Sequence, residues 1–202
     1  MIKFILAALA VGIAAGYVNN NLASMIAGNW ITSYLFNASL YLLLFVMGLS
    51  FGIDKEAVAK LKSTGLRVLI VPFLVALGSI LGGLVGGLIF RLNIFSSMAV
   101  TAGYGWYTLA GPVLVQILGG EWGALGFATN FLRELLTIVT ISSMVKVDKY
   151  APVASGGATT MDTTLPVIVR YCGSDVLITA FSSGFVLSII APFTVIAFAS
   201  LT

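Results

Sequence analysis

The stretch GGATTMDTTLPV, residues 156–167, sets one acid, Asp162, among four threonines. Two glycines open the stretch, Pro166 lies near its end, and long apolar runs flank it on both sides. Glycine, threonine and proline are poor helix formers. The stretch therefore predicts a gap in an otherwise helical chain, with a carboxylate inside the gap.

The composition indicates what kind of protein surrounds this gap. The chain has 202 residues, of which 59% are hydrophobic and 8% are charged. Soluble domains carry about 25% charged residues, and several apolar stretches here exceed the ~18 residues that indicate a spanning helix. The predicted fold class is an all-α polytopic membrane protein. The net charge of +3 does not indicate nucleic-acid binding, because basic residues beside membrane helices set topology.

The residue types present argue against a metal site, an internal disulfide and an enzyme. The chain contains no histidine and a single cysteine, Cys172, so we expect no metal site, no cofactor and no internal disulfide. No nucleophile lies beside a convincing base, which argues against an enzyme. The N-terminal MIKFILAALAVGIAAGY could pass for a signal peptide, but we expect it to be a retained first helix.

Hydropathy divides the chain into five expected spanning helices and two interrupted or re-entrant segments. The helices are expected at about 2–18, 30–51, 66–90, 123–145 and 176–201, and the interrupted segments at 96–119 and 151–170. Gly103, Gly105, Gly111 and Pro112 are expected to break the first of these segments. We expect one transporter domain over 1–202, with a three-helix scaffold at 1–90 and a core with broken helices at 96–202.

The expected 66–90 helix contains glycines at small-xxx-small spacing, namely 78 and 82, 82 and 86, and 83 and 87. Such steps let helix backbones approach closely in lipid. Packing within the molecule is the favoured interpretation, and a dimer interface is the alternative.

The basic residues predict an orientation. With the N-terminus in the cytoplasm and the C-terminus outside, only Arg91 lies outside, and the cytoplasmic set is Lys3, Lys55, Lys60, Lys62, Arg67, Lys146, Lys149 and Arg170. This distribution agrees with the positive-inside rule. It requires each interrupted segment to enter and leave on one side, although full crossings by broken helices stay open.

Three charged residues are candidates for positions near the middle of the bilayer: Arg133, Glu134 and Asp162. Arg133 and Glu134 are adjacent and therefore point about 100° apart around a helix. Asn130, one turn earlier, completes a polar stripe that we expect to face something wet or charged. The stripe is compatible with a structural ion pair, for example Arg133 with Asp162, and with a binding or proton-relay site.

The two breaks favour the second interpretation. Irregular backbone at membrane depth is tolerated only against protein or a water-filled cavity, and in secondary transporters such breaks form the substrate site. The sequence thus predicts a cation-linked transporter in which Glu134 and Asp162 bind protons or substrate. Weaker pocket candidates are Asn130, Arg133, Gly105, Trp106, Tyr107, Thr159, Thr160 and Thr163.

Three segments, GYGWYTLAGP (103–112), FATNFLRELL (127–136) and GATTMDTTLPV (157–167), resemble signature segments of the lysine exporter LysO family. The resemblance covers essentially the whole chain. It implies export of L-lysine, and of analogues such as thialysine, across a bacterial or archaeal inner membrane. It also implies broken, crossing helices of an inverted-repeat transporter and two important intramembrane acids, at Glu134 and Asp162.

Many members of that family carry further N-terminal helices that look like an inverted copy of the 1–90 region. We therefore expect a homo-oligomer or a separate small membrane subunit to supply such helices here. The expected activity is proton antiport of lysine. A passive cation or amino-acid channel, or a membrane subunit that needs a partner for transport, is the alternative.

Overall fold

The computed structural model describes residues 70–202 and ten isolated helical positions that precede them. Apart from those positions, the expected helices 2–18 and 30–51 lie outside the described residues, as do the basic loop after them and the first residues of the 66–90 helix. The chain divides into two compact units, Met1–Ser50 and Phe51–Thr202. All elements with described bounds belong to the second unit.

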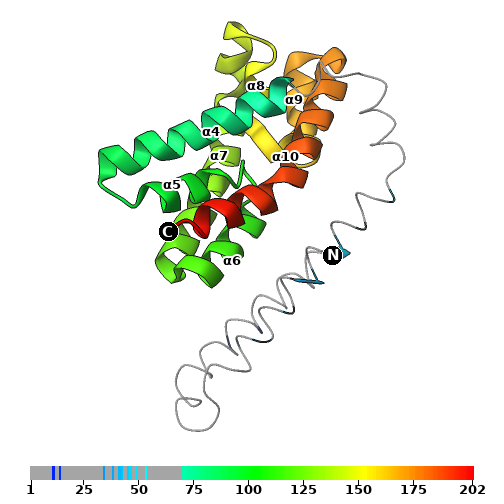
Figure 1. The fold of residues 1–202 in the computed structure, drawn as a ribbon. Coiled ribbons are helices and arrows are strands. Elements are labelled where there is room, and N and C mark those ends of the chain that lie inside the picture. The colour runs from blue at the N-terminus through cyan, green and yellow to red at the C-terminus, as the bar shows by residue number, and fades with distance from the viewer. Residues whose placement is uncertain are drawn as a thin grey trace. The chain divides into compact units, whose positions relative to one another are not determined.

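Residues 70–202 are helical throughout, with short connections (Figure 1). The elements are α4 (Ile70–Phe90), α5 (Ile94–Thr101), α6 (Tyr107–Leu118), α7 (Gly120–Val147), α8 (Ala151–Gly156), the 3-10 helix η2 (Gly157–Met161), α9 (Leu165–Cys172), the 3-10 helix η3 (Ser174–Val176) and α10 (Leu177–Ala199). Within this part of the chain no strand occurs. Three stretches, α4, α7 and Ser174–Ala199, are long and apolar enough to cross a membrane, which confirms the all-α class with apolar spans.

Helices α4 and α7 run antiparallel. Val71 near the start of α4 and Val145 near the end of α7 pack against the same apolar cluster, and Ser79 of α4 is hydrogen-bonded to Arg133 of α7. The end of α4 and the start of α7 therefore lie at one face of the bundle. Thr202 lies there too, because its hydroxyl is 3.2 Å from that of Ser96. This face is called the Thr202 side below, and the opposite face the Lys149 side.

The first interrupted segment is a hairpin made of α5 and α6. It begins just after α4 and ends at Gly119, directly before α7, so both of its ends lie on the Thr202 side. Its tip is the short non-helical stretch between Thr101 and Tyr107. Asn93 caps α5 by accepting a 3.0 Å hydrogen bond from the Ser96 backbone N–H.

Close packing of α4 on α5 explains one of the glycine steps. A Cβ atom on Gly83 would lie 2.7 Å from the Ser97 carbonyl oxygen, and one on Gly87 would lie 3.0 Å from the Ser97 hydroxyl. This step packs within the molecule, as the favoured interpretation states. A Cβ atom on Gly78, Gly82 or Gly86 would meet no described atom within 4 Å.

The expectation that Gly111 and Pro112 help to break this segment is wrong. Both residues lie inside α6. A Cβ atom on Gly111 would lie 3.1 Å from Cβ of Phe127, so the small residue serves close packing of α6 on α7. Pro112 removes one helical hydrogen bond, and its ring still permits helical backbone angles, so the helix continues through it.

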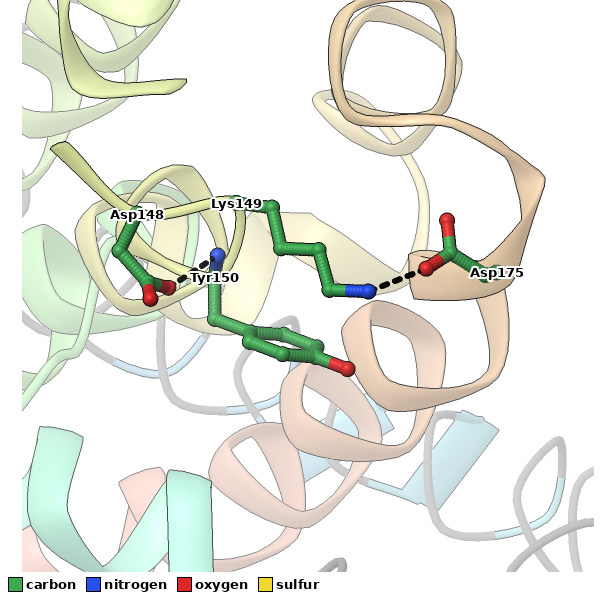
Figure 2. A network of polar contacts seen from close by, with 4 residues as sticks. All are labelled: Asp148, Lys149, Tyr150 and Asp175. Carbon is green, nitrogen blue, oxygen red and sulfur yellow. Dashed lines mark hydrogen bonds and ion pairs between the residues drawn. The ribbon is translucent and has the colours of Figure 1, made fainter. Parts of the chain in front are cut away.

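The second interrupted segment is a hairpin made of α8, η2 and α9, and it enters from the opposite face. Val153 of α8 and Ile168 of α9 share one buried apolar cluster with Ile141, near the end of α7, and with residues at the start of α10. An ion pair between Lys149 and Asp175 joins the residues that precede and follow the hairpin (Figure 2). Both ends of this hairpin therefore lie on the Lys149 side.

Candidate functional site

The tips of the two hairpins meet in the middle of the bundle. The backbone N–H of Ala158 donates to the carbonyl oxygen of Tyr104 over 2.8 Å. Gly105 and Gly157 have positive φ, at 101° and 64°. A Cβ atom on Gly157 would lie 2.2 Å from the Tyr104 carbonyl oxygen, and one on Gly105 would lie 3.1 Å from that of Gly156. Only glycine meets both demands, because it tolerates positive φ and lets the two backbones touch.

Asn130 of α7 fixes the first of these tips. Its side-chain oxygen accepts a 2.7 Å hydrogen bond from the Gly105 backbone N–H. Its amide nitrogen donates to the carbonyls of Val100, at 2.9 Å, and Gly126, at 2.8 Å. Asn130 is 2% exposed, so it faces backbone and not water or charge, contrary to the expected wet stripe. Its role here is to satisfy the backbone groups that the break leaves without partners.

Arg133 of α7 holds the second hairpin. Its Nε donates to the Ser155 carbonyl at 2.7 Å, and its Nη2 donates to the Ala154 carbonyl at 3.0 Å. Its Nη1 donates to the Ser79 hydroxyl at 2.8 Å, which ties α4 to the same group. The guanidinium also lies against the crossing, because a Cβ atom on Gly157 would be 3.1 Å from its Cζ.

These contacts replace the expected alternative of an ion pair between Arg133 and Asp162. Within the described part of the chain, every hydrogen bond of the guanidinium goes to a carbonyl or a hydroxyl. The physical reason is local: the last carbonyls of α8 have no partners within that short helix, and a cation is favoured at a helix C-terminus.

The two acids differ in their surroundings. Glu134 is half-buried, and its Oε2 is buried without a hydrogen-bond partner among the described residues. Asp162 is exposed in the second compact unit, and its Oδ1 accepts a 2.6 Å hydrogen bond from the Thr163 backbone N–H. Glu134 directly follows Arg133 on α7, and Asp162 directly follows η2, so each acid is next in the chain to a part of the crossing.

Tyr107 itself belongs to an aromatic cluster. Its ring lies edge-on to Phe127, with centroids 5.4 Å apart, and to Phe131, with centroids 5.5 Å apart. Trp106 is the half-buried residue that precedes α6 and makes no side-chain cap hydrogen bond. The Tyr107 ring therefore packs against aromatic side chains of α7.

The threonines of the second break mostly serve its own backbone. Thr159 donates to the Gly156 carbonyl at 2.9 Å, and Thr160 donates to the carbonyls of Gly157 and Ala180 at 2.8 and 2.7 Å. Both residues are buried, whereas Thr163 is exposed. Thr163 is therefore the candidate whose hydroxyl remains accessible.

Sequence reasoning missed three features near this crossing. Ser79, the partner of Arg133, is the single polar side chain in α4, and that isolation was a usable signal. Tyr104 is fully buried at positive φ, and nothing in the sequence indicated this. The pairing of Lys149 with Asp175, which raises the pKa of Lys149, was equally hidden.

Comparison with known proteins adds the remaining observations. The family model "Lysine exporter LysO" matches residues 6–199. The chain is 33% identical over 162 residues to the lysine exporter LysO of Escherichia coli, which covers 80% of this chain and 54% of that protein. It is 30% identical over 124 residues to a putative lysine exporter of Haemophilus influenzae, which covers 61% of this chain and 64% of that protein. The chain thus spans about half the length of the first relative and under two thirds of the second. No solved structure matches it.

Proposed function

Because this chain belongs to the lysine exporter LysO family, a family of multi-pass membrane transporters and not of enzymes, we propose that it exports L-lysine from the cytoplasm by proton antiport. Analogues of similar charge and length, such as thialysine, would share the route. The observation that carries the proposal is the pair of acids next to the hairpin crossing: Glu134 follows Arg133, which holds the second hairpin, and Asp162 follows η2.

The charges of the substrate fit these acids. Lysine at neutral pH carries two ammonium groups and one carboxylate, so its binding site requires carboxylates. The Oε2 atom of Glu134 is buried and lacks a hydrogen-bond partner within the part of the chain that the structure describes, which leaves it available to a proton or an ammonium group. Asp162 is exposed on unwound chain, where a substrate can reach it.

The unpaired Glu134 oxygen also suggests why the exchange would be coupled. A buried carboxylate oxygen without a partner is costly. In the proposed scheme the Glu134 carboxylate exchanges a proton for a substrate ammonium. In this scheme a proton arrives from outside, and cytoplasmic lysine displaces it.

In this proposal the hairpins form the gate for alternating access. One enters from each face, and their tips touch through the hydrogen bond between Ala158 and Tyr104. A shift of one hairpin relative to the other would expose the acids to one face at a time. In the proposed topology the hairpins are re-entrant, five helices span the membrane, and the chain forms one half or more of an inverted-repeat transporter.

The proposed orientation has the Lys149 side in the cytoplasm, with the N-terminus there and the C-terminus outside. Lys146, Lys149 and Arg170 lie toward the Lys149 side, and Arg91 follows α4 on the Thr202 side; this distribution follows the positive-inside rule. A Thr202→Cys variant in a Cys172→Ala background should react with an impermeant thiol reagent added to intact cells. Labelling only after lysis would reverse the orientation.

The test of the function uses the purified chain in liposomes loaded with labelled L-lysine. Lysine movement against its gradient, driven by an imposed pH gradient and stopped by a protonophore, supports antiport. Lysine movement only down its gradient would instead indicate a passive channel. Lysine flux that requires co-reconstitution with another membrane protein would indicate that the chain is a subunit. The mass of the purified particle, measured in the same preparation, tests the proposed homo-oligomer or small partner subunit.

A further inference from the structure

A cavity of about 610 Å³ lies between α4, α7 and the start of α8. Its volume falls within the roughly 300–1,000 Å³ of small-molecule sites. Most of its wall is apolar, and its polar side chains include those of Ser79, Arg133 and Asp148. Asp148 and the start of α8 place one part of the cavity on the Lys149 side, while Arg133 brings another part to the hairpin crossing.

Arg133 has hydrogen-bonding capacity left over inside this cavity. Nε, Nη1 and Nη2 each donate one hydrogen bond to the protein, but each Nη atom carries a second hydrogen. The contact of Nη2 with the Ala154 carbonyl is exposed, and Ala154 also lines the cavity. The three bonds hold the guanidinium in one orientation, so a ligand would not have to order it.

Carbonyl and hydroxyl oxygens accept the hydrogen bonds of Arg133, and no carboxylate among the described residues is bonded to it. A carboxylate is the acceptor that best matches the guanidinium fork. The cavity therefore offers a fixed cation with spare N–H donors to a ligand that carries a carboxylate.

We propose that Arg133 binds the α-carboxylate of the transported amino acid, which enters this cavity from the Lys149 side. The proposal rests on the lysine export proposed above and assigns a separate task to each group. Arg133 recognises the substrate as an amino acid, while Glu134 and Asp162 meet its ammonium groups or the proton. Arg133 then determines specificity against diamines, which carry the same ammonium groups without a carboxylate.

The test compares L-lysine with cadaverine, the diamine that remains when lysine loses its carboxylate. Each competes with labelled L-lysine for binding to the purified full chain in nanodiscs. In the wild-type protein cadaverine should bind at least about tenfold more weakly than lysine, the ratio expected for loss of a charge-assisted hydrogen bond. In Arg133→Gln the ratio should fall to near one, because lysine binding weakens and cadaverine binding does not.

A second variant avoids the structural contacts of Arg133. Gly78 lines the cavity, whereas Gly82, one turn further along α4, does not. A Cβ atom on either glycine meets no described atom within 4 Å, so both positions accept a larger side chain. Gly78→Leu should fill part of the cavity and weaken lysine binding, whereas Gly82→Leu should bind lysine as the wild type does.

The outcomes separate this proposal from the proposed function and from another anionic ligand. Equal lysine binding by Gly78→Leu and Gly82→Leu would overturn the proposal, as would an unchanged preference for lysine over cadaverine in folded Arg133→Gln. If anionic lipid in the nanodisc abolishes the Gly78→Leu effect, the occupant is a lipid phosphate and the proposal is also overturned. Absence of lysine binding by the wild-type chain would instead contradict lysine export itself.

Discussion

The carbonyl oxygen of Tyr104 accepts a 2.8 Å hydrogen bond from the backbone N–H of Ala158, and this bond joins two hairpins that enter from opposite faces. Asn130 supports the first tip, and Arg133 supports the second from the same stretch of α7. Both of these supports come from α7, in which the next residue after Arg133 is the half-buried acid Glu134. A residue that holds the crossing, Arg133, and a candidate coupling acid, Glu134, are therefore neighbours on α7.

Gly157→Ala should destabilise the protein by more than the cost of its positive φ alone, because it also disrupts the crossing of the hairpin tips. Gly119, with φ of 96°, provides a matched control because a Cβ atom there meets no described atom within 4 Å. Both glycines have positive φ in sparsely populated regions, which cost a residue other than glycine roughly 1–3 kcal/mol, and both variants bear this cost. Gly157→Ala additionally places Cβ 2.2 Å from the Tyr104 carbonyl oxygen. Thermal unfolding should show a clearly larger loss for Gly157→Ala, and equal losses would contradict the described contact.

Asn130→Ala should destabilise the protein strongly. The substitution leaves the Gly105 N–H and the Val100 carbonyl without their buried partner, at roughly 1–3 kcal/mol for each unsatisfied group. Thr129→Ala, at the exposed neighbouring position, is the control and should unfold like the wild type. A melting temperature for Asn130→Ala equal to that of the control would show that the hydrogen bonds of Asn130 do not stabilise the protein.

Lys149→Met should change stability far less than Asn130→Ala does. Lys149 and Asp175 are 47% and 58% exposed, and exposed ion pairs contribute little and are screened by salt. The pair raises the pKa of Lys149, so any stabilisation is present below the unfolded pKa, about 10.4, and is lost only as pH rises through the folded value. The difference in melting temperature between variant and wild type should therefore stay constant from pH 5 to 8. A difference that varies across that range would rule out this assignment.

Among the described residues, the three long apolar spans and the positions of the two breaks could be predicted from the sequence, because both depend on local composition. The start and end of α10 lie within two residues of those expected from hydropathy, and the break around Asp162 follows from glycine, threonine and proline. Gly111 was misassigned because a glycine serves a break and close helix packing equally well. The alternative partner for Arg133 was wrong because its acceptors are main-chain carbonyls, which every residue carries. Asn130 was misread for the same reason.

Glu134→Gln and Asp162→Asn should each abolish proton-coupled export while leaving the protein folded, because each substitution removes the charge and keeps the shape. Glu121→Gln is the matched control, since Glu121 is exposed in the first turn of the same helix as Glu134. Monodispersity and thermal unfolding of the purified variants check the fold.

Proton movement measured together with lysine movement, in liposomes under an imposed pH gradient, tests the role of these two acids most directly. The wild type and Glu121→Gln should drive lysine uphill while protons pass in the opposite direction, and Glu134→Gln and Asp162→Asn should drive neither. Uphill lysine transport at the wild-type rate by either of these two variants would show that its carboxylate does not couple the exchange.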